Sequence, residues 1–322
     1  MPDFRITEYN CQDADEWNSF VDRSRNATFL LRRDFMEYHS DRFEDLSLIV
    51  RKGGSTVALL PANLTVDAET GDSVLHSHSG LTYGGFLLPE RHLNGSDLLE
   101  IFRQLIVFLR DRGISTIDYK PIPSIYHRMP SQDDLYALFR CNATLTERNI
   151  SCAIRMAANP GLNTQQTRNL HRALSVGVNI EENSDVAEFH RLLTSCLEER
   201  HNAKPVHTAS ELQLLHDRFP DRIRIFLLTA DGEAQAGVCV FDTGMVAHAQ
   251  YICSTARGRR EGLLTLLFTH LFRIFADREY FDFGISNEDH GLYLNEGLYR
   301  QKSSLGGSGV VYDRYRIDLP DA

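Results

Sequence analysis

The sequence has no long apolar run and no recognisable export signal. No stretch approaches the about 18 consecutive apolar residues of a membrane-spanning helix. The first residues, Met1 to Arg5, lack the basic segment followed by an apolar stretch that is typical of a secretory signal. We therefore expect a cytoplasmic chain without a membrane span.

Motifs for metal binding or thiol redox chemistry are also missing. The six cysteines include no Cys-x-x-Cys pair, which argues against a zinc ribbon or a thioredoxin-type site. His76 and His78 lie two residues apart on one predicted strand face, but no third ligand is identifiable. We expect no bound metal.

The chain is short of positive charge. Lysine and arginine number 34 against 44 aspartates and glutamates, so the formal net charge is −10. An acidic chain is not built to bind long nucleic acid through bulk charge, although a local basic patch can hold a phosphate group. We expect no DNA partner.

The length and the order of predicted elements indicate two domains. A chain of 322 residues fits two domains of about 150 residues each. Both halves predict strands, then a long helix, then a short strand that carries an aspartate, Asp118 or Asp282. The predicted strands and helices that repeat are 46–51, 56–66, 96–112 and 115–120 in the first half, and 223–229, 234–242, 245–252, 261–277 and 280–284 in the second.

These patterns predict a mixed α/β fold, with each domain a central mixed sheet flanked by helices. Asn159-Pro160-Gly161 marks the expected boundary, which gives domains of residues 1–159 and 160–322. The predicted long strand 144–156 either closes the first sheet or crosses between the two domains.

The segment between the predicted strand 245–252 and the following helix is rich in glycine and arginine. It runs Ser254-Thr255-Ala256-Arg257-Gly258-Arg259-Arg260-Glu261-Gly262, and we expect residues 254–260 to form a loop. Backbone N–H groups at a helix N-terminus and forked arginine donors together suit an anion. The alternative is a solvated surface loop.

The order of hairpin, strand, arginine–glycine loop, long helix and strand resembles the core of the GNAT N-acyltransferases. That family binds the pyrophosphate of acetyl-coenzyme A with a (Gln/Arg)-x-x-Gly-x-(Gly/Ala) loop. Arg257 and Gly262 fit its first and last positions, and Arg260 stands where the middle glycine is usual. The resemblance implies that the backbone of Tyr251, Ile252 and Cys253 holds the pantetheine arm of coenzyme A. It also implies that the pyrophosphate site comprises Arg257, Gly258, Arg259, Arg260 and Gly262.

A second stretch supports the same resemblance. Asn287 to Leu298 is similar to the GNAT pattern Asn…Leu-Tyr-x-x-x-Gly-Phe, in which the tyrosine often protonates the leaving thiolate. This implies a cofactor contact for Asn287 and a general-acid role for Tyr293, whose phenol has a reference pKa of about 10, close to that of a thiol. The alternative is that Tyr293 is an ordinary residue of an amphipathic helix.

The repeated architecture resembles the Fem-type, or FemAB-like, superfamily of tandem GNAT proteins. Phe281-Asp282-Phe283-Gly284, Lys302 to Gly307 and Thr167 to Ala173 carry this resemblance. It implies that Lys302 lies near the reacting acyl group, where an ammonium stabilises the oxyanion of a tetrahedral intermediate. The alternative is a surface lysine.

Three functions remain open. The first is an N-acyltransferase that moves an acetyl or other acyl group from acyl-coenzyme A to a small-molecule or peptide amine bound in the inter-domain cleft. The second is an aminoacyl-tRNA-dependent transferase that acts on a peptidoglycan precursor, the one reading in which tRNA is a partner. The third is a catalytically degenerate binding module, which Arg260 in place of glycine favours. The acyl chain, the acceptor and the oligomeric state are left open.

Overall fold

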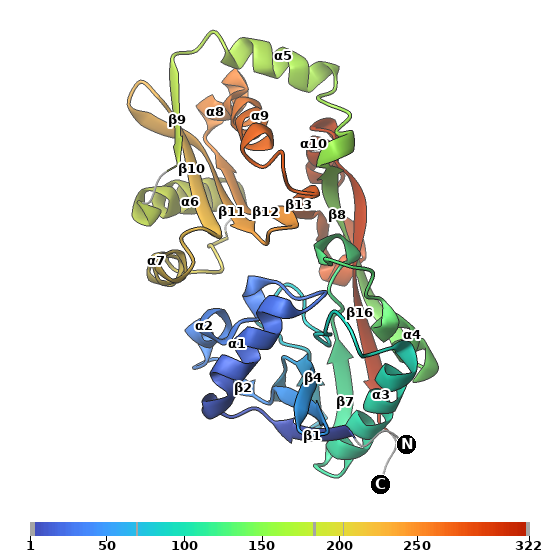
Figure 1. The fold of residues 1–322 in the computed structure, drawn as a ribbon. Coiled ribbons are helices and arrows are strands. Elements are labelled where there is room, and N and C mark those ends of the chain that lie inside the picture. Colours follow the sequence, from blue (N-terminus) through green and yellow to red (C-terminus); the bar gives the residue numbers. More distant parts are fainter. Residues whose placement is uncertain (1–3, 69, 183–184, 202, 320–322) are drawn as a thin grey trace. The chain divides into compact units, whose positions relative to one another are not determined.

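The chain folds into two compact units (Figure 1). The computed structural model describes residues 4–68, 70–182, 185–201 and 203–319, so Met1 to Asp3 of the segment considered for a signal lie outside it. Unit 1 comprises residues 1–149, 290–292 and 311–322, and unit 2 comprises residues 150–289 and 293–310. This division differs from the expected boundary at residue 159. Strands β8 (Thr144–Arg155) and β16 (Ser308–Asp318) each contribute residues to both units, so no single cut separates them.

Unit 1 contains two sheets. Strands β1, β3 and β4 form a three-stranded antiparallel sheet, and the second sheet has the order β2-β5-β6-β7-β16. Within the second sheet only β6 and β7 are parallel. The strands are β1 (Phe4–Glu8), β2 (Glu44–Asp45), β3 (Leu48–Lys52), β4 (Ser55–Leu60), β5 (Asn63–Val66), β6 (Ser73–His76) and β7 (Ile114–Tyr119). The helices are α1 (Ala14–Arg23), α2 (Arg33–Met36), α3 (Gly95–Arg110) and α4 (Asp133–Arg140).

Helix α3 supplies much of the core of unit 1. Its start is set by a capping box in which the Asn94 side chain accepts from the backbone of Asp97, and the Asp97 side chain accepts from Asn94 N. Its buried face repeats at helical spacing through Leu98, Ile101, Phe102, Leu105 and Leu109. Each such side chain contributes about 1.5–3 kcal/mol by leaving water, which holds the helix on the sheet.

Unit 2 contains a sheet in the order β9-β10-β11-β12-β13-β8 and a small antiparallel sheet of β14 and β15. In the larger sheet all neighbouring strands are antiparallel except β12 and β13, which are parallel. The strands are β9 (Val178–Glu182), β10 (Ile223–Ala230), β11 (Glu233–Asp242), β12 (Val246–Ser254), β13 (Tyr280–Ile285), β14 (Asn287–Glu288) and β15 (Tyr293–Leu294). The helices are α5 (Thr164–Ala173), α6 (Val186–His201), α7 (Ala209–Arg218), α8 (Ala256–Glu261), α9 (Leu263–Ile274) and α10 (Glu296–Ser304).

Helices cover both faces of the unit 2 sheet. On one face, Phe268 of α9 packs edge-on against Phe281 and Phe283 of β13, with ring centroids 6.0 and 5.2 Å apart. On the other face, Phe189 of α6 packs over Gly237 of β11, where a Cβ would stand 3.0 Å from the ring. Because strand side chains alternate between faces, Asp282 points away from α9.

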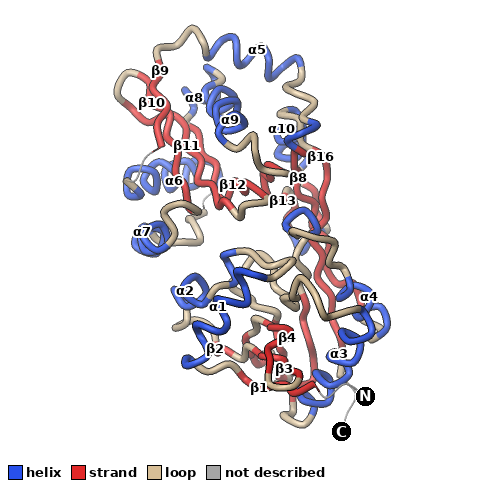
Figure 2. Tube along the Cα trace, in the orientation of Figure 1, coloured by secondary structure: helices blue, strands red, loops and turns tan. Residues whose placement is uncertain are grey.

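The segment expected to be a loop is helical. Figure 2 shows helix following β12 directly, as α8 and then α9. The Thr255 side chain caps α8 by accepting from Gly258 N at 3.0 Å, and Gly262, with a φ of +77°, ends it. The prediction that residues 254–260 form a loop is therefore wrong, because Thr255 caps a helix that begins at Ala256.

Each unit joins its parallel strands with a histidine–aspartate pair. His76 Nδ1 lies 2.5 Å from Asp118 Oδ2 between β6 and β7, and His248 Nδ1 lies 3.1 Å from Asp282 Oδ2 between β12 and β13. In both units this pair is the last in register before the two strands diverge. The repeat expected from Asp118 and Asp282 therefore extends to the histidine that each one binds.

A third strand adds a different partner in each unit. Arg314 of β16 donates to both oxygens of Asp118, whereas the hydroxyl of Ser151 in β8 and the amide of Gly284 donate to Asp282. Asp118 thus faces a full positive charge, whereas the partners of Asp282 include a hydroxyl, an amide and an imidazole.

Asp282→Ala is expected to lower the free energy of unfolding by about 3 kcal/mol, because it leaves buried donors without their acceptor. Urea denaturation measures the change. The exposed Asp221→Ala is the control, with an expected effect within about 0.5 kcal/mol. Equal effects of the two substitutions would contradict a structural role for the pair.

Candidate functional site

Strands β12 and β13 form a fork. Their parallel register covers only Val246, Ala247 and His248 of β12, and the rest of β12 runs on without β13 beside it. On the β11 side, the register of β12 shifts between Ala249 and Tyr251, so Gln250 forms a bulge. The backbone edge of β12 from Ala249 onward is therefore available on the side that faces the fork.

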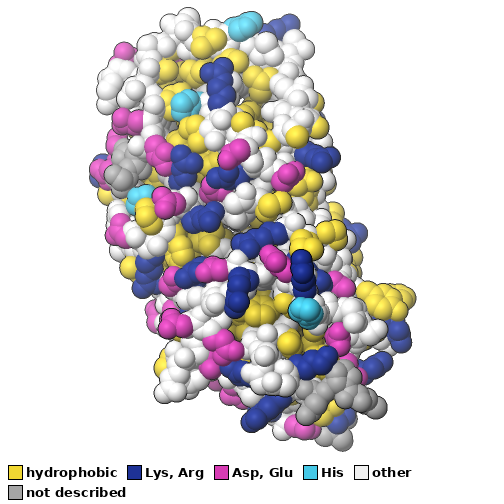
Figure 3. All heavy atoms as spheres, in the orientation of Figure 1, with side chains coloured by type: hydrophobic (Ala, Val, Ile, Leu, Met, Phe, Trp, Pro, Cys, Tyr) yellow, Lys and Arg dark blue, Asp and Glu magenta, His cyan; other side chains and the backbone are white. Residues whose placement is uncertain are grey.

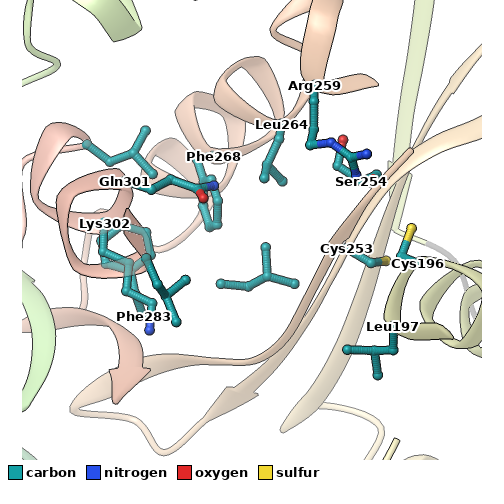
Figure 4. A pocket seen from close by; sticks show the side chains of 13 residues that line it. Cys196, Leu197, Cys253, Ser254, Arg259, Leu264, Phe268, Phe283, Gln301 and Lys302 are labelled. Carbon is teal, nitrogen blue, oxygen red and sulfur yellow. Dashed lines mark hydrogen bonds between the residues drawn. The ribbon is translucent and has the colours of Figure 1, made fainter. Parts of the chain in front are cut away.

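A cavity of about 140 Å³, here called the fork cavity, lies between the separated strand ends (Figure 4). Ile252, Cys253 and Ser254 line it from β12, and Phe283 lines it from β13. Helices close the remaining sides: Leu264 and Phe268 of α9, Leu298, Gln301 and Lys302 of α10, and Cys196 and Leu197 of α6.

A second cavity, of about 210 Å³, adjoins the fork cavity at the N-terminus of α9 and is here called the helix-end cavity. Both are lined by Arg259, Leu264, Phe268, Gln301 and Leu305. The helix-end cavity adds Gln166 and Asn169 of α5 and the backbone around Gly258 and Gly262. The first amides of a helix have no acceptor within it and carry partial positive charge, so this position suits an anion.

The fork cavity has cations at both ends. Figure 4 shows Arg259 at one end and Lys302 at the other, and none of the described side chains that line the cavity is a carboxylate. Arg259 is held in place by donating from Nη1 to Ser254 O at 2.5 Å, with Glu199 3.9 Å from Nη2. The lining therefore favours a ligand that carries negative charge or electron-rich oxygens.

Lys302 is buried at the fork, with 5% of its surface exposed. Its Nζ donates to Gly284 O at 2.8 Å and to Ile285 O at 2.6 Å, both on β13. Burial lowers the pKa of Lys302 to about 8, against the opposing effect of Asp282. Lys302 is therefore not a surface lysine. Its pKa of about 8 lies close to neutral pH, so its ammonium loses a proton more readily than that of an exposed lysine.

The glycines of the predicted phosphate loop have packing roles. A Cβ on Gly258 would stand 2.4 Å from Gln235 O, and one on Gly262 would stand 2.4 Å from Asn169 O. Both glycines let backbone segments approach closely, in addition to any contact with a ligand.

The three arginines of this segment have different surroundings. Arg257 donates to Asp231 at 2.7 Å and to Glu261 at 3.1 Å, and those bonds raise its pKa. The side chain of Arg260 is exposed. Of the three, Arg259 is the one that lines the two cavities.

Besides Arg257 and Arg260, three predicted residues lie outside the linings of both cavities, namely Tyr251, Asn287 and Tyr293. The Tyr251 hydroxyl bonds His207 Nδ1 at 2.6 Å, and Asn287 Oδ1 accepts from Ile150 N at 2.5 Å. Tyr293 lies in strand β15, not in a helix, with 58% of its surface exposed. Ile252, Cys253 and Lys302, by contrast, all line the fork cavity.

Some lining residues could not be anticipated from local patterns. Cys196 and Leu197 come from α6, about 55 residues before β12 in the chain, and no motif marks them. Gln301 does have a signal, because it directly precedes Lys302.

Neither a metal-binding cluster nor a membrane-spanning helix is found in the described part of the chain. Within residues 4–68, 70–182, 185–201 and 203–319, no group of three or more His, Cys, Asp and Glu side chains is placed to hold a metal ion. None of the helices described has the length and apolar character needed to cross a bilayer.

Gly258→Ala is expected to destabilise the chain by about 2 kcal/mol, although alanine normally favours a helix, because the new Cβ overlaps Gln235 O. Thermal unfolding measures the change. Gly177→Ala is the matched control, since a Cβ there meets nothing within 4 Å. A Gly258→Ala variant as stable as the Gly177→Ala variant would contradict the close packing of α8.

The buried Lys302 is expected to make stability depend on pH. Because its pKa falls from 10.5 when unfolded to about 8 when folded, the unfolded chain binds more protons between these values. Stability therefore rises with pH across that window, by up to about 1 kcal/mol per pH unit from this group. Denaturation curves at pH 7.5, 8.5 and 9.5 should show the free energy of unfolding of the wild-type chain increasing relative to that of Lys302→Met as pH rises. A constant difference would exclude the lowered pKa.

Residues 164–291, which include β12, α8, α9 and β13, match the family model described as acetyltransferase (GNAT) domain. No curated protein matches the chain.

Several solved structures resemble the whole chain. FemX is 11% identical, with a TM-score of 0.70 over 98% of this chain and 97% of that one. L-PGS from Bacillus licheniformis is 10% identical, with a TM-score of 0.62 over 96% and 91%. A tandem GNAT protein from the clavulanic acid biosynthesis pathway is 12% identical, with a TM-score of 0.51 over 99% and 100%. Residues 164–291 thus match a GNAT domain, and the chain as a whole has the FemAB-like tandem GNAT fold.

Proposed function

We propose that the chain is an N-acyltransferase that moves an acyl group from acyl-coenzyme A to the amine of a small molecule or peptide. The observation that carries this proposal is the fork cavity, which joins a helix N-terminus at one end to a buried lysine at the other. It lies within the part of unit 2 formed mainly by the matched GNAT domain.

The donor is proposed to lie along β12. Its phosphates occupy the helix-end cavity, where Arg259, the first amides of α9 and the backbone near Gly262 supply positive charge and donors. Its pantetheine arm follows the open edge of β12 past Ile252 and Cys253, where main-chain groups can bond its amides.

The thioester then reaches the Lys302 end of the fork. A buried ammonium strengthens electrostatic stabilisation of the oxyanion that forms when the amine attacks the thioester directly. Positioning of the two reactants supplies much of the remaining rate. Because the pKa of Lys302 is lowered to about 8, this side chain is also suited to give a proton to the leaving thiolate. Tyr293 remains a second candidate for that proton, from the exposed β15.

The second candidate function is a transferase that takes its acyl group from aminoacyl-tRNA. It is favoured by two observations: Arg257 is already bound to Asp231 and Glu261, and Arg260 replaces the middle glycine of the coenzyme A loop. On the face drawn in Figure 3, however, basic and acidic side chains are interspersed, not gathered into the basic field that a large polyanion needs.

Arg259→Ala is expected to raise the dissociation constant for coenzyme A at least tenfold, because it removes the arginine shared by both cavities. Calorimetry with the full chain measures this. Arg257→Ala is the matched control: its ion pairs lie outside the cavities, and we expect less than a threefold change.

Binding of acetyl-coenzyme A and of aminoacyl-tRNA, measured side by side, separates the candidates. Binding of tRNA alone would replace the first function with the second. Binding of neither would favour a degenerate acyltransferase fold kept as a binding module.

A further inference from the structure

The fork cavity contains two thiols that the proposed transfer reaction does not use. Cys196 projects from α6 and Cys253 from β12, and Figure 4 shows their sulfur atoms beside one another at the Arg259 end of the cavity. The Cys253 thiol donates to Gly237 O at 3.5 Å, and its side chain interacts with that of Cys196. Both residues are buried and neither forms a disulfide in this structure.

The surroundings favour a thiolate on Cys196. The neighbouring Cys253 side chain is the largest cause that lowers the pKa of Cys196 to about 7, and the backbone N–H of Ser254 and the charge of Arg259 add to it. Burial and the Glu199 carboxylate oppose the shift. Because the thiolate is the nucleophile, a thiol with this pKa reacts readily near neutral pH.

The other buried cysteines show the opposite behaviour. Burial raises the pKa of Cys239 well above its usual value, and it raises the pKa of Cys152 to about 11. The neighbouring Cys196 side chain and burial raise the pKa of Cys253 as well. Among these four, Cys196 is the one in a position to react first.

We propose that Cys196 and Cys253 form a dithiol–disulfide pair that a hydroperoxide oxidises, tying α6 to β12 across the Arg259 end of the fork cavity. The Cys196 thiolate attacks one peroxide oxygen, the O–O bond breaks, and the departing oxygen leaves as water or an alcohol after taking up a proton. Cys253 then attacks the resulting Cys196 sulfenic acid, the S–S bond forms, and the hydroxyl leaves as water with the Cys253 proton. Two thiols are oxidised and one hydroperoxide is reduced.

The consequence for ligand binding rests on the proposed function. A disulfide draws the two side chains together where Ser254 and Arg259 also line the cavity, so it reshapes the passage from the helix-end cavity to the fork. We expect the oxidised chain to bind coenzyme A at least tenfold more weakly, and dithiothreitol to restore binding.

The chemical test uses the reduced full chain, hydrogen peroxide at pH 7, N-ethylmaleimide to block remaining thiols, and peptide mass spectrometry. The expected product is a Cys196–Cys253 cross-linked peptide that Cys239→Ala still forms and that both Cys196→Ser and Cys196→Ala abolish. In Cys253→Ser, dimedone should trap a sulfenic acid on Cys196. Recovery of Cys196 as its N-ethylmaleimide adduct, while the exposed Cys11 is oxidised, would overturn the proposal.

Calorimetry with coenzyme A then separates this proposal from the proposed function. If the reduced chain does not bind coenzyme A, the proposed function fails, and the cross-linked peptide still decides whether the thiol pair exists. If the disulfide forms and the affinity for coenzyme A is unchanged, the expected effect of oxidation on ligand binding is refuted, while the proposed function stands.

Discussion

The hydrogen bond between His248 and Asp282 marks where the parallel strands of unit 2 stop running together. Before this pair the backbone ladder joins β12 to β13, and after it the two strands diverge. Asp282 is fully buried, and its bonds to Ser151 and Gly284 fix the start of the divergence on β13. The fork cavity, the open edge of β12 and the site of Lys302 all depend on where this pairing ends.

In unit 1 the equivalent histidine–aspartate pair, His76 and Asp118, is followed by closely packed backbone in place of a cavity of this kind. Beyond His76 and Asp118 the chain turns back and fills the fork itself, with Gly84 N donating to Lys120 O at 2.9 Å and Lys120 N donating to the Ser77 hydroxyl at 2.7 Å. A Cβ on Gly84 would stand 1.9 Å from Ser77 O, so only glycine permits this approach. One architecture used twice therefore leaves a ligand-sized space in unit 2, where backbone occupies the corresponding place in unit 1.

Ion pairing and burial decide which basic side chains can offer positive charge to a ligand at the site. The chain is acidic, and Arg257 is held by neighbouring carboxylates, so it has little positive charge left to offer a ligand. Arg259 instead donates to a carbonyl, with Glu199 3.9 Å from its Nη2, and Lys302 donates to two carbonyls. Neither is paired with carboxylates as closely as Arg257 is. The charge of Arg259 also favours a thiolate on Cys196, which links the proposed thiol pair to the fork cavity.

The sequence by itself determined the repeated element order, the mixed α/β class and the importance of the segment from β12 to β13, because hydrophobic periodicity and turn residues act over short distances. Its resemblance to GNAT proteins also pointed to Ile252, Cys253, Arg259 and Lys302, which line the fork cavity in the structure. Only the tertiary structure decided that residues 256–261 are helical, that Arg257 is ion-paired and that Tyr293 is exposed. It alone brought Cys196 to Cys253, because contacts between distant segments arise from packing of the helices on the sheet, which no local pattern encodes.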